Sequence, residues 1–221
     1  RLGVTAAWIL PVEYRSPYWP LDYYRFMEGL GDGAGYRALV DALHGAGLKV
    51  IQDIVPHGGS PEAAHNKARP EFMLRREDGT TLGYWLNDFA REDWQDYVAG
   101  VAEHYVREYG IEGYRVDACM GSKEPNWDPG ITYSRASLAG LWGGLRMVER
   151  IRATVKGVRP DEGAILAETQ SARHAPFCDF MYDFRLCYET LHGWRKMPAA
   201  EFAAALAQNL EDQRQVAPPG M

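Results

Sequence analysis

Charged residues recur at the ends of apolar, strand-like segments in this sequence. They are Asp53, Arg115, Asp117 and Glu168. In folds that alternate strands with helices, catalytic residues come from the C-terminal ends of several strands and meet at one mouth. A single acid in such a place is as easily a helix cap or a partner of loop amides. The recurrence along the chain favours a catalytic interpretation.

The spacing of these residues suits a pair of carboxyl groups with different roles. Arg115 and Asp117 are two residues apart on one strand and so share a face, which places a fixed positive charge beside Asp117 and favours its ionised form. An ionised carboxylate suits a nucleophile, and Glu168 on the adjacent strand could donate a proton. Adjacent strands lie about 4.8 Å apart, close to the separation of about 5–5.5 Å between the carboxyl groups of retaining glycosidases.

Apolar runs alternate with helical patterns along the whole chain. The pattern predicts strands over 4–10, 48–55, 112–118, 164–168 and 180–184, and helices over 36–43, 94–105, 138–151 and 202–210. Short apolar strands that alternate with helices indicate a parallel sheet covered by helices. An open doubly wound sheet usually has a glycine-rich phosphate turn, and the turns at 11–14 and 56–59 lack one. The sequence therefore predicts part of a (β/α)8 TIM barrel, with about five β/α units.

Composition excludes several classes of function. The chain has 221 residues, which suits one sizeable core. A net charge of −6 without a basic run argues against nucleic-acid binding. No apolar stretch reaches the roughly 20 residues of a membrane span. The three cysteines show no metal-binding or disulfide pattern. Seven Trp and 13 Tyr offer many aromatic faces on which sugar rings can stack.

Several motifs together resemble the α-amylase family, glycoside hydrolase family 13. Gly113–Ala118 looks like its G-F-R-x-D-A motif, and Ala164–Thr169 resembles its acid/base motif. Three further segments are similar to its second barrel strand, its Y-x-x-x-D-Y segment and its first signature, D-x-x-x-N-H: 2–11, 18–24 and 49–57. They cover most of the chain in the family's order.

The resemblance implies a mechanism and a substrate class. Asp117 would be the nucleophile and Glu168 the general acid/base of a retaining hydrolase that acts on α-glucosidic bonds of α-glucans or oligosaccharides. Arg115 would hold Asp117. Tyr18 would stack under the sugar in the cleavage subsite, or else pack on the barrel rim, and Asp53 would lie near that subsite.

Departures from the family pattern affect the expected calcium site and the contacts to the sugar and the acceptor. His57 stands where the family has Asn, a common calcium ligand, and Gly58 replaces the following His, a usual contact to the sugar. Imidazole is a poor calcium ligand, so we expect no cofactor. The Lys-His pair that often follows the nucleophile is Met-Gly here. His57 and Trp127 are therefore candidate substrate-binding residues. Asn126 and Trp127 either line the site or form a surface turn.

Three alternatives stay open at this stage. The same site would serve a transglycosylase or a glucoside isomerase, a barrel without the reaction could bind sugars or a protein partner, and an unrelated barrel enzyme would share only the fold. The family's fourth signature, a His-Asp pair, is absent from the sequence. We therefore expect residues 1–221 to be a partial catalytic domain that lacks the first and last strands, carries an inserted loop or subdomain at about 58–90, and is inactive alone.

Overall fold

Five parallel strands form the central sheet in a computed structural model, which describes residues 3–15, 17–132, 142–184, 186–188 and 196–216. Their order across the sheet is β1 (Ala6–Ile9), β4 (Lys49–Ile54), β5 (Gly113–Val116), β6 (Ala164–Ala167) and β7 (Phe180–Met181). An antiparallel ribbon, β2 (Glu13–Tyr14) with β3 (Asp22–Phe26), follows β1. All five predicted strands are present, although β7 is shorter than the segment 180–184.

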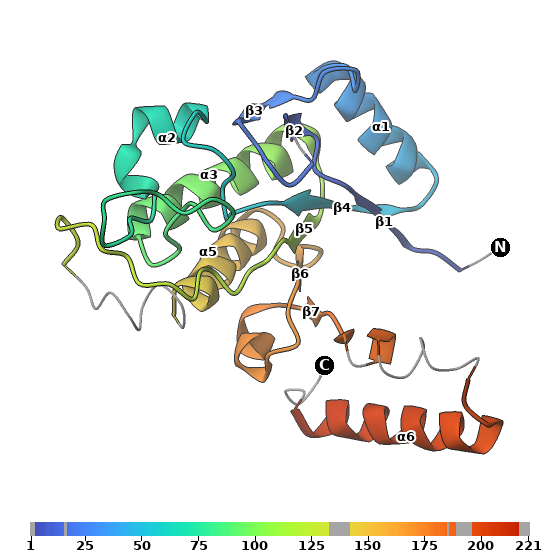
Figure 1. The fold of residues 1–221 in the computed structure, drawn as a ribbon. Coiled ribbons are helices and arrows are strands. Elements are labelled where there is room, and N and C mark those ends of the chain that lie inside the picture. Colours follow the sequence, from blue (N-terminus) through green and yellow to red (C-terminus); the bar gives the residue numbers. More distant parts are fainter. Residues whose placement is uncertain (1–2, 16, 133–141, 185, 189–195, 217–221) are drawn as a thin grey trace.

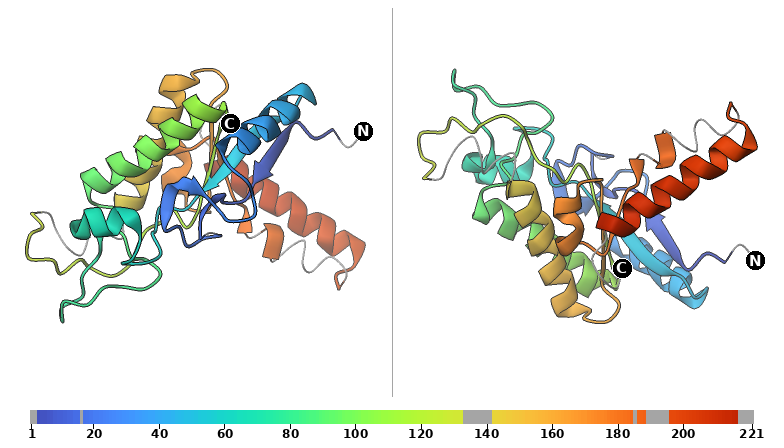
Figure 2. Two further views of the ribbon diagram at one scale, coloured as in Figure 1. Left: turned by 90° about the horizontal axis from the view of Figure 1, so that it is seen from above. Right: turned by 90° about the horizontal axis from the view of Figure 1, so that it is seen from below.

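Helices separate most of the strands. The long ones are α1 (Gly33–Gly45), α3 (Glu92–Tyr109), α5 (Gly143–Val158) and α6 (Ala199–Val216). The short ones are α2 (Ala64–Ala68) and the 3-10 helices η1 (Pro70–Phe72) and η3 (Ala172–Phe177). Helices α3 and α5 pack on each other, whereas α6 lies apart from them in all three views (Figures 1 and 2). The beginning of the helix predicted over 138–151 lies outside the described residues.

Side chains of the sheet alternate between a face covered by helices and an inner face. Register pairs Asp53 with Arg115 and Arg115 with Leu166, so these three point to the same side. The helix-side residues Val50, Ile54, Tyr114, Val116 and Ile165 are completely buried. On the inner face, Trp8 is 48% and Phe180 62% exposed. Strands that alternate with helices in this parallel order make part of a (β/α)8 barrel, as the sequence predicted.

Residues 57–91 form a small excursion between β4 and α3. The segment holds α2, η1 and two isolated bridges, and it buries Leu74 and Leu82 in a minor core. Gly58 has a φ of +76° and packs so closely on Asn87 that an added Cβ would lie 1.6 Å from its Oδ1. Only glycine fits there, because both the backbone angle and the contact exclude a side chain. This turn directs His57 back over the sheet.

Candidate active site

Three carboxyl groups converge on one guanidinium at the C-terminal ends of β4, β5 and β6. Arg115 Nη1 donates to Asp53 Oδ1 at 2.9 Å and to Asp117 Oδ1, and Nη2 lies 2.7 Å from Glu168 Oε1. Arg115, Asp53 and Asp117 are all buried. The register explains the convergence. Asp53 and Arg115 are direct partners on the inner face, and Asp117 and Glu168 follow Arg115 and its partner Leu166 by two residues, which keeps them on the same face. The four charged residues singled out from the sequence thus meet in one cluster.

The backbone after β5 helps to hold Glu168. Ala118 has a φ of +42°, a left-handed conformation that is costly for a residue with a side chain. Its backbone N–H donates to Glu168 Oε2 at 2.7 Å. The sharp turn after Asp117 therefore aims an amide at the neighbouring acid. Sequence reasoning missed this role, since alanine gives no signal of a positive φ.

The environment shifts the pKa values of the two acids in opposite directions. Burial alone would raise the pKa of Asp117, but the hydrogen bond from His57 and the charge of Arg115 lower it below its usual value. Burial raises the pKa of Glu168, and the Asp117 carboxylate adds to this, against the lowering effects of the Ala118 N–H and Arg115. A pair of acids with separated pKa values can divide the work into an ionised nucleophile and a proton donor. The pKa of Asp53 is also raised by burial, to about 6, despite Arg115.

His57 lies against Asp117, completely buried. Its Nε2 is 2.9 Å from Asp117 Oδ2, while Nδ1 faces the carbonyl oxygens of Gly58 at 2.7 Å and Tyr84 at 3.2 Å. Since both ring nitrogens face oxygen acceptors, both are satisfied when the ring carries two N–H groups. The Tyr84 ring stacks on the imidazole, with centroids 4.2 Å apart. The imidazole therefore holds the Asp117 carboxylate in place through this contact. Direct contact of His57 with a sugar stays a prediction.

Tyr18 joins the cluster from the loop after β2. Its hydroxyl donates to Asp53 Oδ2 at 3.2 Å, and its ring centroid is 5.9 Å from Arg115 Cζ. Its φ of +60° is again left-handed for a residue with a side chain. Strained backbone of this kind gathers at functional sites. Whether the ring stacks on a sugar stays a prediction.

The loop after β5 places Asn126 and Trp127 differently. Asn126 is completely buried, and its amide donates to Asp88 Oδ2 at 2.7 Å while its oxygen accepts from the Arg75 N–H at 3.0 Å. Asn126 Oδ1 also accepts from the Asp128 N–H at 3.0 Å, so Asn126 does begin a turn, although its own side chain is buried and joins two loops. Whether Asn126 lines the site stays a prediction. Trp127 is 40% exposed, and its backbone N–H donates to the Arg75 carbonyl at 2.8 Å. A sugar contact for Trp127 stays a prediction.

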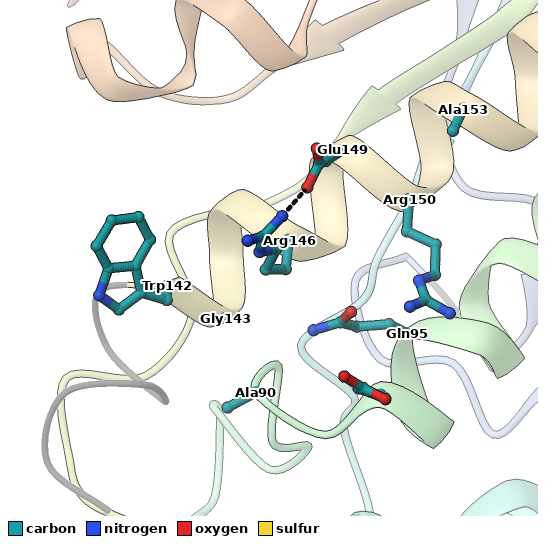
Figure 3. Close-up of a pocket in the computed structure, with 9 residues that line it drawn as sticks. Ala90, Gln95, Trp142, Gly143, Arg146, Glu149, Arg150 and Ala153 are labelled. Carbon is teal, nitrogen blue, oxygen red and sulfur yellow. Dashed lines mark hydrogen bonds and ion pairs between the residues drawn. The ribbon is translucent and has the colours of Figure 1, made fainter. Parts of the chain in front are cut away.

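A separate hollow of about 690 Å³ lies between α3 and α5 (Figure 3). Its walls carry both signs of charge and one exposed aromatic ring, from Gln95, Trp142, Arg146, Glu149 and Arg150 among others. Arg146 and Glu149 form an ion pair across one helical turn at 2.6 Å. None of the converging carboxyl groups lines this hollow. The candidate active site is therefore the carboxylate cluster on the inner face of the sheet.

Metal-ligand clusters and membrane-spanning helices are both absent from the part of the chain that the structure describes. Across it, no group of three or more His, Cys, Asp or Glu side chains is arranged to hold a metal ion. No described helix is long and apolar enough to cross a membrane.

Comparisons with known proteins agree with this fold. No family model matches the chain. A 1,4-alpha-glucan branching enzyme of Nocardia farcinica is 33% identical over 161 residues, which cover 62% of this chain and 21% of the relative. One from Mycobacterium bovis is 29% identical over 195 residues, with 76% and 25% covered. This chain thus spans about a fifth to a quarter of the length of these relatives.

Solved structures agree on the fold. An α-amylase from Lactobacillus plantarum superposes on 96% of this chain with a TM-score of 0.74 and 20% identity, using 52% of its own length. A maltogenic α-amylase from Thermotoga neapolitana superposes on 99% with a TM-score of 0.73 and 19% identity, using 49% of its own. The fold is that of an α-amylase-type (β/α)8 barrel. Both kinds of comparison support the resemblance of this chain to part of the catalytic domain of the α-amylase family, glycoside hydrolase family 13.

Proposed function

We propose that the protein is a retaining enzyme that acts on α-glucosidic bonds, with Asp117 as nucleophile and Glu168 as general acid/base. The observation that carries this proposal is the pair of opposed pKa shifts around one guanidinium. Arg115 and His57 favour the ionised form of Asp117, while burial favours the protonated form of Glu168. Sugar binding alone does not require buried acids with separated pKa values, whereas acid and nucleophile chemistry does. This arrangement therefore favours an enzyme over a non-catalytic sugar-binding barrel.

The reaction would proceed by double displacement. The Glu168 carboxylic acid protonates the leaving oxygen while an Asp117 carboxylate oxygen attacks the anomeric carbon, which breaks the glycosidic bond and forms a glycosyl ester. Glu168, now ionised, then takes a proton from the incoming acceptor hydroxyl, whose oxygen displaces Asp117. Arg115 would hold Asp117 in line throughout and offset the negative charge of the cluster.

The acceptor decides between hydrolysis and transfer. Water as acceptor gives a hydrolase of α-glucans, and a sugar hydroxyl gives a transglycosylase such as a branching enzyme. The second candidate is favoured by the relatives from Nocardia farcinica and Mycobacterium bovis, which are 1,4-alpha-glucan branching enzymes. Product analysis on amylose distinguishes the two, because transfer creates new branch points whereas hydrolysis creates reducing ends.

Two substitutions in the full-length protein test the assigned roles. Asp117→Asn should reduce turnover on every substrate by several orders of magnitude, because no glycosyl ester can form. Glu168→Gln should mainly impair substrates with poor leaving groups, since an activated aryl glucoside needs no proton for its first step. Rates on maltooligosaccharides and on an aryl α-glucoside measure the difference. An equal loss on both substrates for Glu168→Gln would assign the acid to another residue.

We also propose that the activity does not depend on calcium. The support is the state of His57 at the position where the family has an asparagine: both ring nitrogens already face protein oxygens, and imidazole is a poor ligand for a hard cation. Hydrolysis rates and melting temperature should stay unchanged after treatment with EDTA. A loss of activity that added calcium restores would contradict the proposal.

A further inference from the structure

Arg115 uses its third donor group on a residue that the proposed mechanism does not mention. The two terminal nitrogens face the three carboxyl groups, and Nε donates to the Tyr182 hydroxyl at 3.1 Å. A guanidinium is planar and carries its N–H groups in a fixed fork, so a partner at Nε restricts the rotation of the other two nitrogens. Tyr182 immediately follows β7, two strands away from Arg115 in the sheet.

The Tyr182 ring is itself held in place across the curved sheet. Its edge meets the Trp8 ring, with centroids 6.3 Å apart, and Arg115 Cζ lies 5.4 Å from each of these two rings. Trp8 belongs to β1 and Tyr182 follows β7, so residues from the two ends of the strand order meet around the guanidinium. Cation–π attraction to both rings adds to the hydrogen bond.

We propose that Tyr182 is a positioning residue that fixes the orientation of Arg115 toward the acids, an inference that rests on the function proposed above. Nη1 is bound by Asp53 and Asp117 together, whereas Nη2 has the contact with Glu168, whose side chain is 25% exposed. Loss of the bond at Nε therefore loosens the contact with Glu168 first. Tyr182 thus acts on the general acid through Arg115 and need not touch the substrate.

A looser contact with Arg115 would change the pKa of Glu168. Arg115 lowers the pKa of Glu168, so a looser contact lets that pKa rise. The alkaline limb of kcat/KM, where the general acid loses its proton, then moves to higher pH. The titratable groups that face Glu168 or Tyr182 come from several elements and stay in place in this change: Asp53 on β4, Tyr84 in the 57–91 excursion, and Asp117 and Cys119 just after β5.

The test is Tyr182→Phe in the full-length protein, with Tyr24→Phe as the matched control. The substitution keeps the ring and its contacts and removes only the hydroxyl. Tyr24 is 48% exposed on β3, against Tyr97 and His104, and has no contact with the acids. We expect kcat on a maltooligosaccharide to fall about tenfold in Tyr182→Phe, the usual effect of losing one hydrogen bond to a charged group. KM should change little, and the alkaline limb should move to higher pH. The control should match the wild type.

Each outcome has one meaning. A Tyr182→Phe enzyme with wild-type kcat and pH profile overturns the inference and leaves the proposed function intact. A lower kcat with an unmoved pH profile also overturns it, since a purely structural effect would look like this. A wild-type protein without activity on any α-glucoside overturns the proposed function, and this inference with it. Melting temperatures of all three proteins show whether the compared samples are equally folded.

Discussion

Glu13 on β2 is a buried acid that no cation faces among the residues that the structure describes. Its side chain accepts from Gln52 Nε2 at 3.1 Å through Oε1, while Oε2 has no partner among the described residues. Burial, followed by the nearby Asp53, raises its pKa to about 7. The charged form of Glu13 also acts on a group of buried phenols, Tyr23, Tyr36, Tyr105 and Tyr114. Glu13 is therefore most stable in the core when it is protonated.

This burial makes stability depend on pH. The folded protein holds the Glu13 proton up to about pH 7, whereas the unfolded chain releases it near 4.5, so the folded state binds more protons between these values. The contribution of Glu13 to the free energy of unfolding is then complete below about pH 4.5 and is lost as the pH rises toward 7. Glu13→Gln should remove this loss and raise the free energy of unfolding at pH 8 by about 3 kcal/mol, on the order of the pKa difference.

Urea unfolding at pH 5 and pH 8 checks this prediction. The surface variant Glu28→Gln serves as the control and should keep the wild-type dependence on pH. A Glu13→Gln protein whose stability falls between the two pH values as steeply as that of the wild type would show that Glu13 is ionised at little cost in the fold.

At the scale of elements, β5 must approach β6 closely to bring Arg115 and Asp117 beside Glu168. Gly113 permits this approach, because a Cβ there would lie 1.8 Å from the Ala164 carbonyl oxygen. We expect Gly113→Ala to destabilise the protein by about 3 kcal/mol, since backbone atoms of a paired strand cannot move aside easily. Activity should fall as well, because β5 carries Arg115 and leads directly into Asp117.

Gly100→Ala is the matched control for this strand. Gly100 lies in α3, and a Cβ there meets no atom within 4 Å. Alanine favours helix over glycine by roughly 0.5–1 kcal/mol, so this variant should be as stable as the wild type or slightly more stable. Urea unfolding of both variants measures the contrast. Equal effects from the two substitutions would show that the contact between β5 and Ala164 is not tight.

The strands and the clustering of the four charged residues could be predicted from the sequence, because both depend on patterns within short segments. Apolar runs marked β4, β5 and β6, and the two-residue period then placed Asp53, Arg115 and Asp117 on one face. The positions of Ala118 and Tyr182 had no such signal, since one depends on a strained backbone angle and the other on a contact between distant strands. The buried role of Asn126 also depends on a second loop, and a pattern along one segment does not contain that information.

For the whole molecule, the inner face of the sheet decides how residues 1–221 behave alone. Trp8 is 48% and Phe180 62% exposed on this face, and β1 and β7 each have one edge without a partner strand among the described residues. Unpaired edges beside exposed apolar side chains promote association. The His-Asp pair of the family's fourth signature is also absent from the 221 residues. We therefore expect this chain alone to self-associate and to hydrolyse no measurable α-glucan.

Size-exclusion chromatography with light scattering at several concentrations, together with an amylose assay, measures both properties. Phe180→Ser should shift the distribution toward monomer, because it removes an exposed ring from the edge strand β7 and leaves the carboxylate cluster untouched. Glu28→Ser, an exposed position outside the sheet, should change nothing. A monodisperse and active wild-type chain would mean that the five strands already make a stable and sufficient site, and that the inner face tolerates water far better than its aromatic side chains suggest.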